Sequence, residues 1–132
     1  MEKKEVLYLP VTAEWFKLIK SGVKRVEYRE IKAHWIKRLF FRNIDGDRYR
    51  LSDIWALFYS DKLVREILEA DIKSGELEPI YEYVEFTRGY PTKDDKERRA
   101  RFVIDSITIG KPQKGLCPDE FLGNEYLCIN FK

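Results

Sequence analysis

The stretch SGVKRVEYREIKAHW, residues 21–35, contains the change of periodicity that decides how this part of the chain folds. Up to residue 29 charged and apolar side chains alternate, which predicts a strand with one polar and one apolar face. From Ile31 to Arg42 apolar residues recur every three or four positions, which predicts an amphipathic helix. We therefore expect a strand that leads directly into a helix with a basic outer side.

The length and composition of the chain are those of one folded domain, residues 1–132. Hydrophobic residues make up 44% of the chain, aromatic residues 14% and charged residues 36%, which excludes an intrinsically disordered protein. The sequence shows neither a signal-peptide pattern nor a run of about 18 apolar residues. We therefore expect a cytoplasmic protein that does not enter a membrane.

Further strands and helices are predicted along the chain from the same two periodicities. Strands are expected at residues 6–11, 24–29, 54–60, 80–86, 101–110 and 126–131. Helices are expected from Thr12, whose hydroxyl would cap the first turn, to about Lys20, and from Asp61 to Gly75. Residues 45–47 mark a turn. The order of elements predicts an α+β domain whose mixed, curled sheet approaches a β-barrel, with two N-terminal helices and one short acidic helix around it.

Charge is distributed unevenly along the chain, although the formal net charge is only +2. Residues 24–50 contain nine basic and four acidic side chains, and residues 88–101 contain six basic and three acidic ones. Residues 61–86 reverse the balance, with eight acidic and three basic side chains. If the two basic segments are neighbours in the fold, they form one surface suited to phosphate or another anion.

Gly22, Lys24, Glu27 and Arg29 fall in the spacing G-x-K-x-x-E-x-R. Glu27 and Arg29 share one face of the predicted strand, and Lys24 can join them only from an irregular start of that strand. In that geometry the carboxylate would stay ionised and hold both cations in place, which leaves donors for an incoming anion. The alternative is a surface salt bridge without further role, which the spacing alone favours.

Other candidate residues lie on the predicted basic helix and in the loop that begins at Arg88. His34, Arg38 and Arg42 are four residues apart and would form one basic row. A solvated helix face is the alternative interpretation of this row, and it is preferred over a catalytic His34. Arg88 and Tyr90 have the composition to hold a phosphate and stack on a base, or to form a rigid turn with Tyr90 packed inward.

Metal-binding and disulfide-forming residues are scarce. The chain contains one histidine, His34, and two cysteines, Cys117 and Cys128, which indicates neither a structural zinc site nor a disulfide scaffold. We expect free thiols, with a bridge between the two cysteines as the alternative. No metal and no cofactor are predicted.

The motif G-x-K-x-x-E-x-R, the run YREIKAHWIKRL and the later F-T-R-G-Y resemble the ASCH domain family, which is related to the PUA domains of RNA-binding proteins. The match extends over essentially the whole chain in the order of its elements. The resemblance implies a small PUA-like β-barrel with a cleft between the barrel and the N-terminal helices, lined by the motif residues. It also implies recognition of RNA or a nucleotide.

Some members of the family that this chain resembles are enzymes. One branch is an amidohydrolase acting on N4-acetylcytidine, with a lysine, a nucleophilic threonine three residues later and a distant glutamate. In this chain the third residue after Lys24 is Glu27, so that nucleophile is missing. Other members are linked to ribonuclease action, for which the resemblance implies Lys24 and Glu27 as a proton-transfer pair and Arg29 as a phosphate clamp.

The leading hypothesis is a domain that binds RNA or a nucleotide, with single-stranded RNA as the expected partner. The expected binding residues are Lys24, Glu27, Arg29, Arg38, Arg88 and Tyr90. The first alternative is a hydrolase in the same cleft, a ribonuclease or a modified-nucleoside amidohydrolase, with Lys24 and Glu27 as catalytic residues. The second alternative is a protein-interaction module that uses the acidic helix at residues 61–73. The sequence leaves the oligomeric state open.

Overall fold

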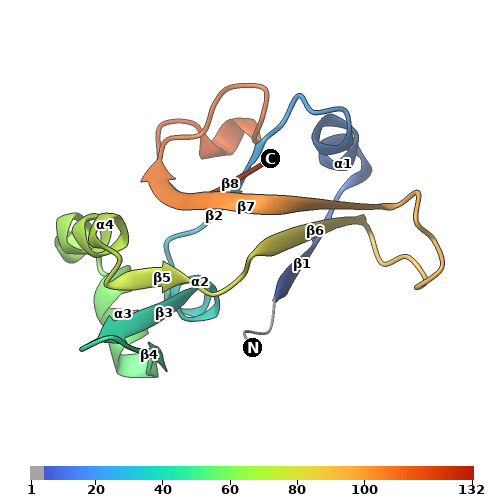
Figure 1. The fold of residues 1–132 in the computed structure, drawn as a ribbon. Coiled ribbons are helices and arrows are strands. Elements are labelled where there is room, and N and C mark those ends of the chain that lie inside the picture. The colour runs from blue at the N-terminus through green and yellow to red at the C-terminus, as the bar shows by residue number, and fades with distance from the viewer. Residues whose placement is uncertain (1–4) are drawn as a thin grey trace.

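The structure, a computed structural model, describes residues 5–132 and contains a five-stranded and a three-stranded sheet. The strands of the larger sheet lie in the order β1-β6-β7-β8-β2 (Figure 1). Their bounds are Val6–Val11 (β1), Val26–Arg29 (β2), Tyr83–Arg88 (β6), Arg99–Gly110 (β7) and Tyr126–Phe131 (β8). β1 pairs with β6 in parallel, and the other neighbours are antiparallel. The predicted α+β class is therefore confirmed.

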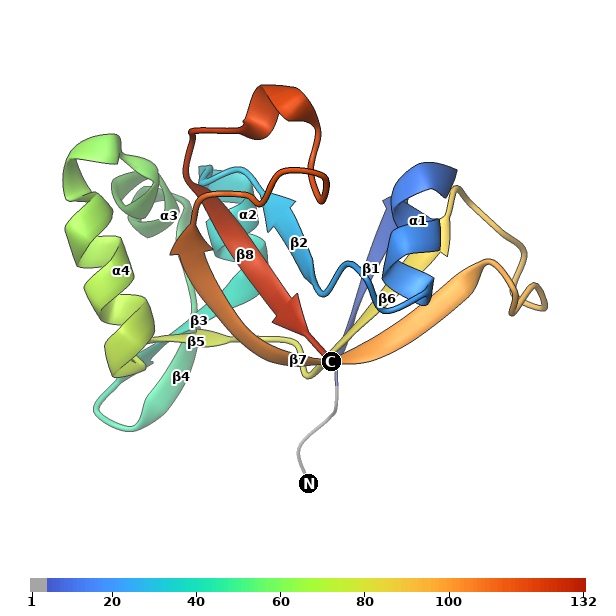
Figure 2. The ribbon, with the colours of Figure 1, turned by 90° about the horizontal axis from the view of Figure 1, so that it is seen from above.

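β7 connects the two halves of the larger sheet. Its first part, residues 99–103, pairs with β6, and its second part, from Ile104 to Gly110, pairs with β8. The register shifts between Ile104 and Ser106, and Figure 2 shows β7 as a curved ribbon. The edge strands β1 and β2 do not pair with each other within residues 5–132, so the sheet is curled but open.

The smaller sheet is built around β3, Phe40–Ile44. β4, Asp47–Arg50, pairs with one side of β3 and β5, Leu77–Pro79, with the other, both in antiparallel orientation. β3 and β4 are joined by Asp45 and Gly46, whose φ values of 51° and 87° are those of a type I′ hairpin turn. The turn predicted here is confirmed.

Within residues 5–132, four α-helices pack around the sheets. Their bounds are Ala13–Lys20 (α1), Ala33–Leu39 (α2), Asp53–Ser60 (α3) and Arg65–Ser74 (α4), and two short 3-10 helices are Lys62–Val64 (η1) and Asp119–Phe121 (η2). α1 begins after Thr12 as predicted, but the Thr12 hydroxyl makes no capping hydrogen bond. The predicted acidic helix is formed by η1 and α4: the Asp61 carboxylate accepts from the N–H of Leu63, and Gly75 ends α4 with φ 87°.

The helix predicted from Ile31 to Arg42 is shorter in the structure, because α2 ends at Leu39. Phe40 is already extended, with φ −125° and ψ 141°, and begins β3. The pairing of β3 with both β4 and β5 supplies the backbone hydrogen bonds that another helical turn would have made. Arg42 therefore lies on a strand, and the predicted basic row of three helical residues does not form.

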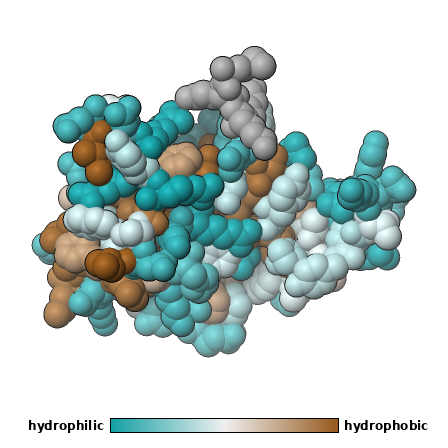
Figure 3. Space-filling view, turned by 90° about the horizontal axis from the view of Figure 1, so that it is seen from below, coloured by the Kyte–Doolittle hydropathy of each residue, from teal (hydrophilic) through white to brown (hydrophobic). Residues whose placement is uncertain are grey.

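The strand predicted at residues 54–60 is wrong, because these residues form α3. The Ser52 hydroxyl accepts a hydrogen bond from the backbone N–H of Trp55 at 3.2 Å, which caps the helix. Ala56 and Tyr59 point inward and are buried, whereas the outward side of α3 stays exposed. A short apolar run does not distinguish a buried strand from a helix by its pattern. Figure 3 shows apolar side chains gathered at the lower left, over this helix.

The C-terminal strands are confirmed with shifted bounds, since β6 begins at Tyr83 and β7 at Arg99. Two apolar clusters hold the elements together. The main cluster joins both sheets to the helices through residues such as Leu7, Ile36, Leu68, Phe86 and Ile129. A smaller cluster fixes the loop before β8 against β2 and contains Tyr28, Cys117, Tyr126 and Cys128.

Replacing Ser52 by alanine removes the hydroxyl that caps α3, and we expect the free energy of unfolding to fall by about 1 kcal/mol. Urea denaturation followed by circular dichroism measures this change. Ser52→Asp supplies another good capping side chain and should remain within about 0.5 kcal/mol of the wild type. Equal stability of the wild type and the Ser52→Ala protein would show that this hydrogen bond does not stabilise α3.

Candidate functional site

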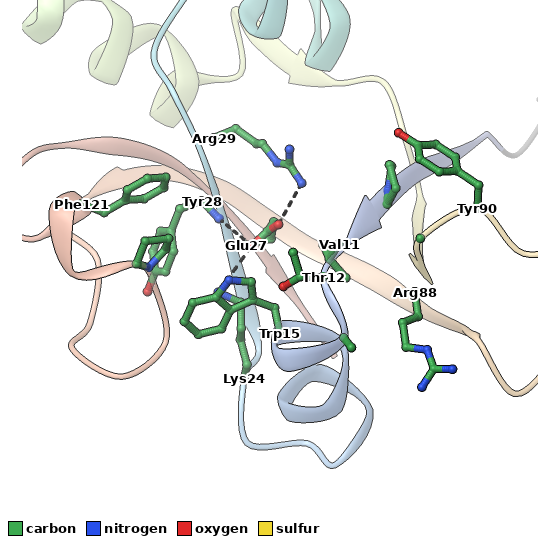
Figure 4. A pocket seen from close by; sticks show the side chains of 14 residues that line it. Val11, Thr12, Trp15, Lys24, Glu27, Tyr28, Arg29, Arg88, Tyr90 and Phe121 are labelled. Carbon is green, nitrogen blue, oxygen red and sulfur yellow. Dashed lines mark hydrogen bonds and ion pairs between the residues drawn. The ribbon is translucent and has the colours of Figure 1, made fainter.

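A cavity of about 640 Å³ lies between the two edge strands of the larger sheet, a volume in the range of small-molecule sites. It is bordered by the end of β1, the start of α1, β2, and the loops that follow β6 and precede β8 (Figure 4). Its aromatic lining consists of Trp15, Tyr28, Tyr90 and Phe121. Its charged lining consists of Lys24, Glu27, Arg29 and Arg88. The cavity therefore combines flat apolar faces with three cations and one carboxylate.

Lys24 lies in the turn between α1 and β2. This turn is the irregular start of the strand from which Lys24 was expected to join Glu27 and Arg29. Gly22 allows this turn because its φ is +86°. The Lys24 side chain is only 2% exposed, and its ammonium donates a hydrogen bond to the carbonyl of Leu116. The ammonium also lies over the rings of Trp15 and Tyr28, at 5.1 and 4.9 Å from their centroids. Lys24 is thus enclosed by the protein and holds the loop before β8.

Glu27 lies between the two cations of the motif. Its Oε1 is 3.4 Å from the Lys24 ammonium, and its Oε2 accepts a hydrogen bond of 2.8 Å from the Arg29 guanidinium. Oε1 also accepts from the backbone N–H of Tyr28 at 3.3 Å. With its side chain 11% exposed, this carboxylate is more than a surface salt bridge, because both oxygens are engaged away from bulk water. The structure therefore brings Lys24, Glu27 and Arg29 together.

Arg29 connects the motif to α2. Its guanidinium lies 5.0 Å from the centroid of the Trp35 ring, and Arg38 lies 5.2 Å from the same ring. The Nε of Arg29 is buried without a hydrogen-bond partner in the structure. Figure 4 shows the end of the side chain directed toward Glu27 at the cavity. Arg29 is therefore a fixed cation with donor capacity that the protein does not use.

Burial changes the proton affinity of two side chains at the site. Desolvation lowers the pKa of Lys24 below its usual value, and the nearby Glu27 carboxylate acts in the opposite direction. Burial raises the pKa of Tyr28, whose hydroxyl accepts a hydrogen bond from the backbone N–H of Gln113 at 3.2 Å. Lys24 and Tyr28 thus fasten the same loop at two points.

The structure places the other predicted site residues at different distances from the cavity. Arg88 and Tyr90 line it, and Tyr90 is 93% exposed, so the interpretation that this ring packs inward is wrong. Arg38 lies outside the cavity, where it reaches the carbonyl of Tyr8 at 3.4 Å. His34 is exposed on α2, with its ring 5.3 Å from that of Trp35.

The loop that carries Tyr90 is held by a second buried carboxylate, which the sequence analysis did not identify. Glu85 on β6 forms ion pairs with Arg99 at 3.1 Å and Arg101 at 3.0 Å, both on β7. Arg99 also donates to the carbonyls of Pro91 and Thr92 at 3.1 Å each. Glu85 and Arg101 are direct partners in the strand register. The opposite charges of Glu85 and Arg101 on two predicted strands could have indicated this contact from the sequence.

A second cavity, of about 730 Å³, adjoins the first and lies between α1 and the loop after β6. Its charged lining consists of Lys17, Lys20, Arg88, Arg98, Asp95 and Glu97. Arg88 and Ala13 belong to both cavities. The Lys20 ammonium donates to the carbonyl of Glu97 at 2.7 Å, which joins α1 to the loop after β6. The two basic segments of the sequence both contribute to the first cavity, through Lys24 and Arg29 from one segment and Arg88 from the other.

The described residues offer few ligands for a metal ion. Within residues 5–132 no group of three or more His, Cys, Asp or Glu side chains is placed to hold one. Cys117 and Cys128 are free and buried, and burial raises the pKa of both thiols, which disfavours the reactive thiolate.

Comparison of the chain with family models, with curated proteins and with solved structures finds no match. In the part of the chain that the structure describes, no helix has the length and apolar character needed to cross a membrane.

Lys24→Met leaves the Glu27 carboxylate buried with one cation fewer, and we expect the free energy of unfolding to fall by about 3 kcal/mol. Urea denaturation measures this change. Lys32 provides a matched control, because its ion pair with Glu30 is exposed, and Lys32→Met should change stability by less than about 0.5 kcal/mol.

The double variant Lys24→Met/Glu27→Gln removes both charges of the buried pair. We expect it to lose less stability than the two single variants lose together, because no charge is then left without its partner. Strictly additive losses would show that the two side chains are not coupled.

Proposed function

We propose that this chain is a cytoplasmic RNA- or nucleotide-binding domain whose ligand occupies the cavity between β1 and β2. The observation that carries the proposal is the presence of aromatic faces and arginine side chains in one cavity. Aromatic rings stack on bases of any sequence and arginine binds phosphate, which is how many proteins hold single-stranded nucleic acid. The free thiols of Cys117 and Cys128 support a reducing compartment.

The proposal gives each cavity residue a separate role. Arg29 and Arg88 contact phosphate, and Arg29 is positioned by Glu27 before a ligand arrives. Tyr90 stacks on a base, because its ring is exposed on a loop at the edge of the cavity. Lys24, whose ammonium is already engaged, keeps Glu27 in place below the ligand. Glu27 orients the cations or accepts a hydrogen bond from a base edge.

The second basic cavity favours single-stranded RNA over a free nucleotide. Because Arg88 belongs to both cavities, a strand with one base in the first cavity would carry its next phosphates over α1. Lys17 and Lys20 supply cations along this path, whereas Arg98 is paired with Asp95 at 3.3 Å. Binding of this kind depends on several phosphates at once, which makes its affinity strongly dependent on salt.

We also propose that the chain belongs to the ASCH family and has a PUA-like fold. Two features support this assignment. The motif residues Lys24, Glu27 and Arg29 line a cavity beside the first helix, as the resemblance implies. The curled five-stranded sheet is the part of the structure that would correspond to the barrel.

Fluorescence anisotropy of a labelled single-stranded RNA against salt concentration tests the proposal. Arg29→Ala and Arg88→Ala each remove one proposed phosphate contact. For each variant we expect weaker binding, and we expect the slope of log affinity against log salt concentration to become smaller in magnitude by about 0.7. Tyr90→Ala should weaken binding on the order of tenfold, because one base loses its stacking partner. Lys62→Ala, an exposed lysine outside both cavities, is the matched control and should bind like the wild type.

One result would contradict the proposal, and another would restrict it to a free nucleotide. If all three cavity variants bind RNA as the wild type does, the cavity is not the binding site. If RNA fails to bind at low salt, while a mononucleotide binds with an affinity that depends on Tyr90, the ligand is a free nucleotide and the role assigned to the second cavity is wrong.

A hydrolase in the same cavity is the second candidate function, and one observation favours it. Lys24 has a lowered pKa and lies 3.4 Å from the Glu27 carboxylate, and such perturbed pairs occur often at catalytic sites. In this alternative Glu27 is the general base and Lys24 stabilises developing charge. Glu27→Gln should then still bind RNA but lose cleavage on a denaturing gel by about a hundredfold or more. Full cleavage by that variant would exclude a catalytic Glu27.

A further inference from the structure

A groove with basic side chains lies between α2 and α3. Its volume is about 610 Å³, and it shares no lining residue with the cavity between β1 and β2 or with the cavity beside α1. Its charged lining consists of Lys37, Arg38, Arg50 and Asp53. The RNA site proposed above therefore leaves this groove without a role.

The lining of the groove has an excess of positive charge. Lys37 and Asp53 form an ion pair at 2.6 Å and compensate each other. Arg38 contacts a backbone carbonyl, and Arg50 contacts an aromatic ring. Within residues 5–132 neither arginine forms an ion pair with an acidic side chain. Two guanidinium groups in the groove can therefore bind an anion.

The charges next to the groove do not cancel this excess. On β4, Arg48 forms an ion pair with Glu78 of β5 at 2.9 Å. Asp47 lies at the hairpin end of β4, whereas Arg50 lies at the opposite end of that strand. α2 contains no acidic residue, and α3 contains only Asp53, which is already paired. The groove therefore presents a positive surface.

One aromatic ring connects the groove to the cavity between β1 and β2. Arg29 lines that cavity, and Arg38 lines the groove. Their guanidinium carbons lie 5.0 and 5.2 Å from the centroid of the same Trp35 ring. Figure 4 shows Arg29 and Arg88 at separate borders of the cavity. Arg88 leads to the cavity beside α1, so Arg29 marks a different exit, toward the groove.

We propose that the groove between α2 and α3 binds the continuation of the single-stranded RNA whose base occupies the cavity between β1 and β2. This inference rests on the function proposed above. Successive phosphates contact Arg29, Arg38 and Arg50. The His34 ring and the Leu57 side chain, which are exposed in the groove, offer surface to a base.

The groove and the cavity beside α1 would hold the RNA on two sides of the base in the central cavity. The protein then binds an internal segment of a strand, and neither end of the RNA has to be free. This extends the proposed function from one base and its neighbouring phosphates to a path across three sites.

The connection to the central cavity favours RNA over other anions in the groove. A free phosphate or an acidic peptide would need the groove alone, and neither accounts for cations that continue from the cavity through Trp35. A nucleic acid strand carries a phosphate at every nucleotide, so it needs cations beyond the position of its bound base. Arg29, Arg38 and Arg50 meet this need from three separate elements, β2, α2 and β4.

Fluorescence anisotropy with two labelled RNAs tests the inference. A dinucleotide fills only the central cavity, and a strand of about twelve nucleotides also reaches the groove. Arg38→Ala/Arg50→Ala should bind the longer RNA more weakly, with a slope of log affinity against log salt concentration that is smaller in magnitude by about 1.4. The dinucleotide should bind this variant like the wild type. Arg38→Lys/Arg50→Lys keeps both positive charges and should restore most of the slope.

Lys62→Ala/Lys73→Ala is the matched control for the loss of two positive charges. Both lysines are exposed and line neither the groove nor the two cavities, so this variant should bind both RNAs like the wild type.

Three results would overturn the inference. If Arg38→Ala/Arg50→Ala leaves the slope for the longer RNA unchanged while Arg29→Ala lowers it, the groove is excluded and the proposed function of the central cavity stands. If the dinucleotide loses as much affinity as the longer RNA, Arg38 acts by holding Arg29 and not by contacting RNA. If binding depends on none of these arginines, the groove and the central cavity are both excluded.

Discussion

One buried carboxylate determines how the elements around the cavity come together. Glu27 has a cation on each side, and each cation is attached to a different part of the chain. Lys24 donates to the carbonyl of Leu116 in the loop before β8, and Arg29 lies against Trp35 on α2. A buried carboxylate without these partners would be strongly destabilising. The turn after α1, β2, α2 and the loop therefore meet around a single charge.

This arrangement also explains why the site lies at the open side of the sheet. β1 and β2 are edge strands, and proteins cover such edges or fill them with charged side chains. Here the space between the edges is lined by Glu27, Arg29 and aromatic rings from α1 and two loops. The loops that contribute to the lining are attached to strands by hydrogen bonds, from Arg99 on β7 to the carbonyl of Pro91 and from the N–H of Gln113 to the hydroxyl of Tyr28 on β2. Binding residues on loops supported by a rigid scaffold are common in proteins.

The sequence predicted those parts of the structure that depend on neighbouring residues. The alternation around Glu27 and Arg29 placed both on one face of β2, and Gly22 indicated the turn from which Lys24 joins them. The end of α2 was predicted too late because Phe40 pairs with β5, far away in the sequence. α3 was predicted as a strand because its run of apolar residues hides the helical period.

The loops of the site could not be predicted for a related reason. Phe121 reaches the cavity only because Lys24 and Tyr28 fasten the loop before β8 at two points remote from it in sequence. Tyr90 is presented by a loop that Arg99 holds through two backbone carbonyls. Side chains with no local periodicity obtain their position from such long-range bonds.

The shared strand β7 has a consequence for the width of the cavity. Within the larger sheet as residues 5–132 form it, β7 is the one strand that joins β1 and β6 to β8 and β2. The register shift between Ile104 and Ser106 lies where β7 passes from one half of the sheet to the other, and a bend at such an irregularity contributes to the separation of the two edge strands. Ile104 and Ser106 do not line the cavity, yet they belong to the strand that joins its two walls. The shape of the cavity therefore depends on a strand that lies apart from the residues named in its lining.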